Sequence, residues 1–209
     1  MRDDFDNDEK VLAGSRLIRL PPQAPRTGSP LWLRRLARRI FEYYGWRMEG
    51  YFPDQPRALL IVAPHSSAWD AWWGLLVKIA LGLQVEFMAK REAFWWPLGW
   101  LLRRFGAFPV DRKSPGGVVG SLAERARARD QLWLLIAPEG TRKSVREWKS
   151  GFWRIAREAK LPVVCVYFHY PTRTIGIGPT IAMTEDFAAD MAQLRMFYQP
   201  WVGRHRGTG

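Results

Sequence analysis

The chain contains two apolar runs that each end abruptly in a short polar segment. Leu59 to Ala63 is followed by Pro-His-Ser-Ser-Ala-Trp-Asp, which ends at Asp70, and Leu132 to Ile136 is followed by Ala-Pro-Glu-Gly-Thr-Arg, which ends at Arg142. Short apolar runs bounded by turn residues are typical of buried strands, and open α/β sheets bind their ligands where such strands end. One turn supplies a possible base, and the other supplies an acid, a glycine and an arginine. Together they indicate an enzyme that acts on an anionic substrate.

Strands and helices alternate over most of the chain. The expected strands span residues 57–63, 84–89, 107–110, 132–136, 162–168 and 174–178, and the expected helices span residues 70–82, 117–128, 147–160 and 185–198. Residues 91–105 form an aromatic and partly helical segment between them. This alternation predicts an α/β fold: a single-domain αβα sandwich around a mostly parallel or mixed sheet, preceded by an amphipathic helix.

Length and composition favour one folded domain with anionic partners. A chain of 209 residues is long enough to bury a full core. Its formal charge of +12 favours phosphates, acidic lipids, an acidic carrier protein or nucleic acid. Its twelve tryptophans favour an interface between an apolar and an aqueous region, such as a membrane surface. The alternative is a soluble basic protein with a tryptophan-rich core.

Nothing in the sequence indicates export or a membrane-spanning helix. Residues 1–10 are acidic, unlike a signal peptide, and no apolar run reaches the roughly 20 residues that a spanning helix needs. Cys165 is the single cysteine and lies in an apolar run, so we expect it in the core. If the protein meets a membrane, it is expected to lie on the surface.

We expect three segments around a central domain of residues 51–200. Residues 1–30 look like an acidic and then proline-rich tail, and residues 201–209 look like a basic tail. Residues 31–50 are expected to form a basic amphipathic helix that contacts a membrane. The alternative is a surface helix that packs on the core while its arginines are simply solvated. The pattern consists of apolar residues at helical spacing and arginines on the remaining arc: Leu31, Trp32, Leu33, Leu36, Ile40, Phe41 and Tyr44, against Arg34, Arg35, Arg38 and Arg39.

His65 and Asp70 form the candidate catalytic pair. His65 follows an expected strand, and Asp70 lies in the first turn of the next helix, close enough in sequence to reach the imidazole. A carboxylate on one ring nitrogen fixes the tautomer and leaves the other nitrogen free to accept a proton, so the histidine can act as a general base near neutral pH. The alternative is structural, because Ser67 to Asp70 also matches a capping box.

Other classes of enzyme find little support. The serines beside His65 do not lie in a Gly-x-Ser-x-Gly elbow, which argues against a serine hydrolase. No glycine-rich loop precedes Lys-Ser or Lys-Thr, which argues against an NTPase. Three scattered histidines and one cysteine make a poor metal site. A His–Asp pair without a neighbouring nucleophile is suited instead to deprotonating a substrate hydroxyl, which makes the substrate the nucleophile.

These motifs, in their order and spacing, resemble those of the glycerolipid (1-acylglycerol-3-phosphate type) acyltransferases over roughly residues 57–180. His65-x-x-x-x-Asp70 resembles the first block of that family, and Pro138 to Arg142, with its Glu-Gly-Thr-Arg sequence, resembles the third. Gly106 to Arg112 resembles the second block, and Leu161 to Val164 resembles the fourth. Two positions depart from the family pattern: Pro64, where the family usually has Asn, and Ala137, where it usually has Phe.

The resemblance implies transfer of a fatty acyl group from acyl-CoA or acyl carrier protein to the hydroxyl of a lysophospholipid such as 1-acylglycerol-3-phosphate, in phospholipid synthesis. It makes residues 51–200 an acyltransferase domain, with His65 as the general base and Asp70 as its orienting partner. The two arginines of the blocks are expected to bind an acceptor phosphate, Glu139 to hold the site together, and Gly140 to let backbone approach the ligand. The implied substrate-binding residues are Arg112, Glu139, Gly140, Thr141 and Arg142.

The resemblance also implies partners and a location. No metal or bound cofactor is needed, and the protein is expected to be peripheral, on the cytoplasmic face of an anionic membrane. One alternative keeps the chemistry but changes the acceptor to an amine-containing lysolipid, a polyene or another alcohol. The other is a non-catalytic basic protein that binds a membrane or nucleic acid. No recognised nucleic-acid module appears in the sequence, so nucleic acid is not an expected partner.

Overall fold

The computed structural model describes residues 11–110, 117–141, 145, 147–205 and 207. Within these residues the strands form one seven-stranded sheet with the order β1-β7-β6-β2-β5-β3-β4. Strands β2 to β6 run parallel to one another, whereas β7 and β1 run antiparallel to them, which confirms the expected α/β fold around a mixed sheet. The strands are β1 (Arg47–Gly50), β2 (Arg57–Ala63), β3 (Glu86–Lys90), β4 (Ala107–Val110), β5 (Leu132–Ile136), β6 (Val163–His169) and β7 (Thr174–Ile181).

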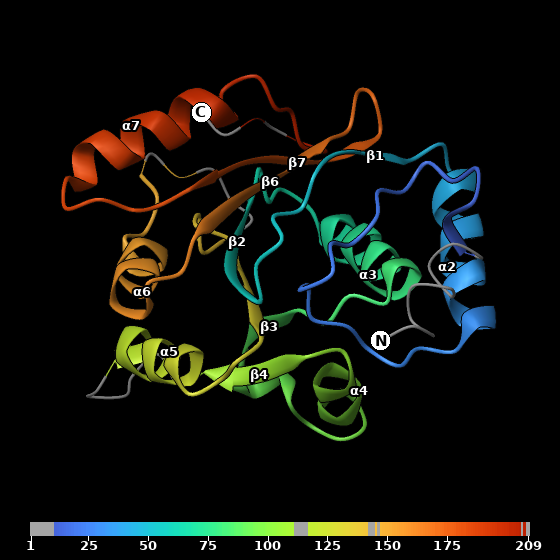
Figure 1. Ribbon diagram of the computed structural model, residues 1–209, viewed down its shortest axis with the longest axis horizontal. Coiled ribbons are helices and arrows are strands. Elements are labelled where there is room, and N and C mark those ends of the chain that lie inside the picture. Colours follow the sequence, from blue (N-terminus) through green and yellow to red (C-terminus); the bar gives the residue numbers. More distant parts are fainter. Residues whose placement is uncertain (1–10, 111–116, 142–144, 146, 206, 208–209) are drawn as a thin grey trace.

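Helices cover both faces of this sheet (Figure 1). The connections β2–α3–β3 and β3–α4–β4 advance across the sheet in one direction, whereas β4–α5–β5 and β5–α6–β6 return. Right-handed crossovers therefore place α3 and α4 on one face and α5 and α6 on the other. The first face is covered by α2 (Leu31–Tyr43), α3 (Ala68–Leu81), the 3-10 helix η1 (Arg91–Ala93) and α4 (Leu98–Arg104), and the second by α5 (Gly117–Arg127), α6 (Gly151–Ala159) and α7 (Phe187–Tyr198).

Strand β2 lies at the centre of the core and is covered on both sides. Leu60 and Val62 pack into the cluster formed with α2 and α3, and Leu59 and Ile61 pack into the cluster formed with α5, α6 and α7. A strand covered on both faces has a continuous apolar sequence, as this strand has. Its burial fixes the position of the turn that follows it.

Residues 11–30 differ from the tail that the sequence suggested, because they pack on the side of the core that holds α2 and α3. Their backbone pairs with the segment after α3: the N–H of Thr27 donates to the carbonyl of Gly82, and the N–H of Gln84 donates to that of Pro25. Several apolar side chains of this segment are buried. These side chains are Val11, Leu12, Leu17, Leu20 and Ala24.

Residues 31–50 are helical only in their first part, which corrects the expected helix. α2 ends at Tyr43, and Gly45 takes a positive φ of 77°. Residues 47–50 then form the edge strand β1, which pairs with β7. A glycine in the left-handed region turns the chain out of the helical path, so the strand can begin after only three intervening residues.

Arg34 does not lie on the solvated face of α2, as the arginine pattern had suggested. Its side chain is buried, and its guanidinium donates hydrogen bonds to the carbonyls of Ala80 and Leu81 at 3.1 Å each. Carbonyls at the end of a helix lack intrahelical partners and carry partial negative charge, so an arginine there is stabilising. The buried face of α2 packs on α3. Trp32 and Leu36 are exposed, so the helix also presents apolar side chains outward.

Candidate active site

The two motif-bearing turns lie side by side at one edge of the sheet. β2 and β5 are adjacent and parallel, with Ile61 paired to Ile136, so the segments after them leave the sheet at the same place. β6 is parallel to β2 on its other side, which brings the residues after His169 to this edge. We call this the carboxyl edge, because β2 to β6 all end there. It is the position at which open α/β sheets hold their ligands.

His65 and Asp70 contact each other at this edge. Nδ1 of His65 lies 3.2 Å from Oδ2 of Asp70, and the same oxygen accepts hydrogen bonds from the N–H groups of Ser66 and Ser67 at 2.9 Å each. The hydroxyl of Ser67 accepts from the N–H of Trp69, which completes a capping box. The cap and the imidazole contact therefore coexist and share one carboxylate.

Asp70 has another partner that the sequence analysis missed. The hydroxyl of Tyr170, which directly follows β6, donates to Oδ1 of Asp70 at 2.6 Å. Burial raises the pKa of Tyr170, and its hydrogen bond to Asp70 raises this pKa further, so the hydroxyl stays protonated. A signal for Tyr170 was present, because the expected strand of residues 162–168 also ends in a polar turn.

The surroundings of Asp70 keep its carboxylate ionised. Burial by itself raises the pKa of Asp70, but hydrogen bonds from His65, Tyr170 and Ser67 outweigh that effect, so its pKa lies below the ordinary value. An ionised carboxylate beside Nδ1 places the ring proton on that nitrogen and leaves Nε2 able to accept a proton. The His65 side chain is 27% exposed, so a substrate can reach it.

Glu139 connects the second motif to the first. Its Oε1 accepts a hydrogen bond from the backbone N–H of His65 at 3.0 Å, and its side chain is buried. Gly140 follows with a φ of 65°, and a Cβ there would lie 3.0 Å from the Lys149 side chain. The left-handed turn therefore favours glycine at this position, and a larger residue would also displace the Lys149 side chain. Thr141 is half-buried beside it.

Arg112 and Arg142 lie outside the described residues, so their predicted contact with a phosphate stays a prediction. Another arginine lies close to the turn that bears His65 and Asp70. The guanidinium carbon of Arg204 is 5.2 Å from the centre of the Trp69 ring, and its charge opposes the rise in the pKa of Tyr170. The sequence predicts only a basic tail for this region.

The segment that carries Arg204 runs along the carboxyl edge. The N–H of Tyr170 donates to the carbonyl of Val202 at 2.9 Å, and the N–H of Val202 donates to Nδ1 of His169 at 3.1 Å. The N–H of His205 donates to the hydroxyl of Ser66 at 3.4 Å. These contacts hold the C-terminal segment against the turn that bears the catalytic pair.

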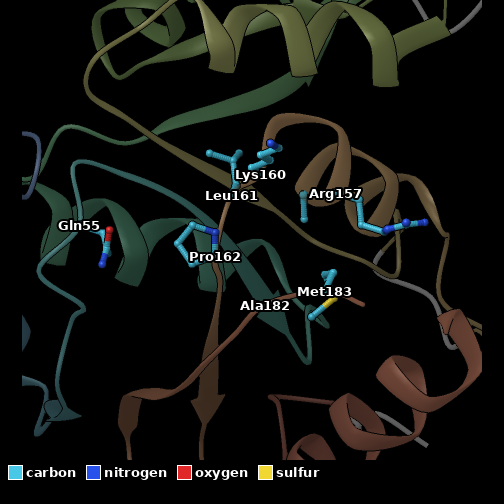
Figure 2. Close-up of a pocket in the computed structure, with 8 residues that line it drawn as sticks. Gln55, Arg157, Lys160, Leu161, Pro162, Ala182 and Met183 are labelled. Carbon is cyan, nitrogen blue, oxygen red and sulfur yellow. The ribbon is translucent and has the colours of Figure 1, made fainter. Parts of the chain in front are cut away.

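A cavity of about 430 Å³ lies at the edge of the sheet where β2 and β6 begin, opposite to the edge that bears His65 and Asp70. Figure 2 shows residues that line it. Its walls include Gln55 before β2, Lys160 after α6, Pro162 before β6 and Met183 after β7. It contains none of the predicted site residues, and we assign it no catalytic role. Across the described part of the chain, no three His, Cys, Asp or Glu side chains gather in a way that could hold a metal ion.

Comparison with known proteins identifies the family. The family model described as Acyltransferase matches residues 47–169, which are more than half of the chain and contain both motif-bearing turns. The chain belongs to this acyltransferase family.

Two curated relatives and one solved structure are similar to the chain. It is 31% identical over 126 residues to the 1-acyl-sn-glycerol-3-phosphate acyltransferase of Streptococcus pneumoniae, a match that covers 60% of this chain and 47% of that protein. It is 30% identical over 120 residues to the enzyme of the same name from Bacillus subtilis, which covers 54% of this chain and 56% of that one. The chain therefore spans about half the length of these relatives.

The solved structure is the crystal structure of the 1-acyl-sn-glycerophosphate acyltransferase from Thermotoga maritima. It aligns with a TM-score of 0.58 over 81% of this chain and 76% of that one. The sequence identity is 16%, so this likeness shows the fold alone.

Proposed function

We propose that this protein is an O-acyltransferase that moves a fatty acyl group from a thioester to the hydroxyl of a lysophospholipid such as 1-acylglycerol-3-phosphate, in phospholipid synthesis. The observation that carries the proposal is the 3.2 Å contact between Nδ1 of His65 and Oδ2 of Asp70. A base held in this way is suited to activating a hydroxyl of the substrate. The acceptor class follows the names of the two curated relatives.

The reaction begins when Nε2 of His65 takes the proton of the acceptor hydroxyl. The acceptor oxygen attacks the carbonyl carbon of the thioester, and the carbon–sulfur bond of the tetrahedral intermediate then breaks. The sulfur leaves as a thiolate and takes the proton from the imidazolium, so the products are an ester and a free thiol. Asp70 stays ionised because its hydrogen bonds hold its pKa low, and its charge stabilises the imidazolium.

The remaining predicted residues bind the substrate or support the turn. Arg112 and Arg142 bind the acceptor phosphate, since a planar guanidinium can form two parallel hydrogen bonds to phosphate oxygens. Glu139 holds the backbone of His65, and Gly140 and Thr141 complete the turn beside it. The donor is acyl-CoA or acyl carrier protein, and both carry the negative charge that suits a chain with a net charge of +12.

A lysophospholipid acceptor lies in a membrane, so the enzyme must contact the membrane surface. We propose that this protein is peripheral and lies on the cytoplasmic face of an anionic membrane. Among the described residues, no helix is long and apolar enough to cross a bilayer. The exposed face of α2 combines Trp32 and Leu36 with Arg35 and Arg39, which is typical of an interfacial helix. Its opposite face, which includes Phe41, is buried in the core.

The test is an acyl-transfer assay of the purified full chain. Acyl-CoA and acyl carrier protein serve as alternative donors, and the acceptors are 1-acylglycerol-3-phosphate, an amine-containing lysolipid, a phosphate-free monoacylglycerol and other alcohols. We expect ester formation to be fastest with the phosphate-bearing acceptor. A folded protein that forms ester with none of these acceptors would overturn the proposal, and a strong preference for another alcohol would reassign the acceptor.

A further inference from the structure

The exposed tryptophans of the described chain all lie on one helical layer. Each is at least 43% exposed, and Trp96 reaches 85%. A tryptophan buries about 150–250 Å² when it is covered, so several exposed together indicate a surface that has a partner. They belong to α2, to α3 and to the segment from η1 through α4: Trp32, Trp69, Trp72, Trp95, Trp96 and Trp100.

Most of these tryptophans lie toward the carboxyl edge, where the candidate active site is. Trp69 and Trp72 lie in the first turns of α3, which begins directly after the turn that bears His65. Trp95 and Trp96 follow η1, which comes directly after β3. β3 ends at the same edge as β2, because β5 pairs in parallel with both strands.

α3 and α4 are neighbours on the same face of the sheet (Figure 1). Burial and the nearby charge of Arg104 on α4 together lower the pKa of Lys78 on α3 to about 8, so the ends of these two helices lie close to each other. Both helices cover the same face of the sheet, and their exposed aromatic side chains lie on the outer side of that helical layer. We call this surface the aromatic face and define it by Trp69, Trp72, Trp95, Trp96, Trp100 and Leu101.

Arginines lie among these aromatic side chains. Arg103 and Arg104 are exposed on α4, and the guanidinium of Arg103 lies 5.1 Å from the centre of the Phe94 ring. Arg204 lies against Trp69 in the same way. Tryptophan favours the headgroup level of a bilayer, and arginine near it favours anionic lipids. This combination fits an anionic membrane surface better than it fits a neutral protein partner.

We infer that the aromatic face is the surface with which the protein lies on an anionic phospholipid bilayer, and that the lysolipid acceptor passes across it from the bilayer to His65. The inference rests on the proposed function and deepens it, because it names the surface through which a lipid acceptor reaches the catalytic pair. Within the described chain, this helical layer alone presents exposed tryptophans, and we assign the bilayer to it. The proposed contact with the bilayer lies beside the candidate active site.

The inference also limits the part played by α2. This helix runs antiparallel to α3, because Arg34 near its start bonds the last carbonyls of α3, whereas Tyr44 after its end lies 5.5 Å from the ring of Trp73. Trp32 therefore lies at the end of α2 that is remote from the carboxyl edge. We expect Trp32 to contribute less to lipid binding than the aromatic face does.

The test is co-sedimentation of the full chain with phosphatidylcholine vesicles that contain or lack phosphatidylglycerol. The test variant carries Trp95→Ser, Trp96→Ser and Trp100→Ser, and the matched control carries Trp32→Ser, Tyr51→Ser and Met196→Ser, which replace exposed apolar residues elsewhere. We expect affinity for anionic vesicles to fall at least about tenfold in the test variant and less than about threefold in the control. Circular dichroism and thermal unfolding confirm that both variants are folded.

Activity supplies a second readout that separates this inference from the proposed function. The test variant should keep the wild-type kcat on a short-chain acceptor dissolved as monomers and should lose activity on the same headgroup embedded in vesicles. A wild-type protein that is inactive on both acceptors, yet binds vesicles through the aromatic face, would refute the proposed function and leave this surface assigned. The inference would be overturned if the wild type failed to bind vesicles or if the two variants bound them equally. It would also be overturned if the test variant lost self-association in place of lipid binding.

Discussion

Oε1 of Glu139 accepts a hydrogen bond from the backbone N–H of His65 at 3.0 Å, across 74 positions of sequence. This contact joins the turn after β5 to the turn after β2, so the two motifs form one unit. Glu139 is 1% exposed, which keeps water from competing for the bond. From this contact we propose that Glu139 positions His65.

Replacing Glu139 by Ala leaves the His65 N–H without this acceptor in a buried place. We expect the free energy of unfolding to fall by about 1–3 kcal/mol, the usual cost of an unsatisfied buried donor. We also expect kcat to fall about 10²-fold, because a displacement of the catalytic base by about 1 Å can cost that much in rate. Glu139→Gln keeps an acceptor oxygen of the same shape and serves as the control, with a smaller loss in both quantities. Urea unfolding and steady-state kinetics measure them, and wild-type kcat in Glu139→Ala would contradict the positioning role.

Tyr170→Phe removes the hydroxyl that donates to Asp70 but keeps a ring against Trp46. Loss of this donor raises the pKa of Asp70, because the bond from Tyr170 is one of the contacts that lower it. We therefore expect the acid side of the kcat/KM profile to move to higher pH. We also expect kcat to fall by about tenfold or more, since a hydrogen bond to a charged group contributes about 1.5–3 kcal/mol.

The matched control for Tyr170 is Tyr167→Phe, whose lost hydroxyl bonds Glu49 on β1 instead of Asp70. This control also removes a tyrosine hydroxyl from the region of β6. We expect it to leave the pH profile of kcat/KM unchanged. If Tyr170→Phe also leaves the profile unchanged, the hydroxyl serves the fold and does not position the catalytic pair.

Asp70 couples the stability of the fold to pH. Burial raises its pKa, but the hydrogen bonds from His65, Tyr170 and Ser67 outweigh this, so the folded-state pKa lies below the ordinary 3.8. The unfolded chain therefore takes up the proton at higher pH than the folded protein. The stabilisation is fully present above the unfolded-state pKa and is lost as the pH falls through the lower folded-state pKa. Asp70→Asn should lower the free energy of unfolding at neutral pH and flatten its decline in acid. Urea unfolding across this range measures the slope, and a slope equal to that of the wild type would contradict the assignment.

Much of the fold could be predicted because it depends on local patterns. β2, β4 and β5 occupy the residues expected from their short apolar runs between turn residues. β1 was missed because its sequence, Arg-Met-Glu-Gly, has no apolar run and forms a strand by pairing with β7. α6 begins at Gly151 instead of residue 147, since the N–H of Lys149 bonds the carbonyl of Pro138 and so belongs to the turn after β5.

The candidate site was predictable where its residues directly follow strands. His65 and Asp70 lie five positions apart, so their contact depends on one turn and needs no knowledge of the sheet order. Tyr170 and Arg204 depend instead on β6 lying beside β2, and on the C-terminal segment docking there, which no local pattern specifies. Burial of Arg34 likewise depends on where α3 ends.

The proposed binding of a phosphate by Arg112 and Arg142, which lie outside the described residues, gives a further prediction. Arg142→Lys keeps the positive charge but cannot form the bidentate hydrogen bonds of a guanidinium. We therefore expect kcat/KM for 1-acylglycerol-3-phosphate to fall by about tenfold or more. Arg112→Lys should behave in the same way. The loss should largely disappear with a phosphate-free acceptor, and kinetics of both variants on both acceptors measure this. Equal losses on the two acceptors would show that these arginines serve the fold or the acyl donor.

In the proposed mechanism, His65 is the base that activates the acceptor hydroxyl. The most direct measurement is kcat of the His65→Ala protein with saturating acyl thioester and 1-acylglycerol-3-phosphate, on a protein shown by circular dichroism to be folded. The side chain lies in a partly exposed turn, so its removal should leave the fold intact. We expect a loss of about 10²–10⁴-fold, the usual contribution of a general base. A folded His65→Ala protein with near-normal turnover would contradict this mechanism.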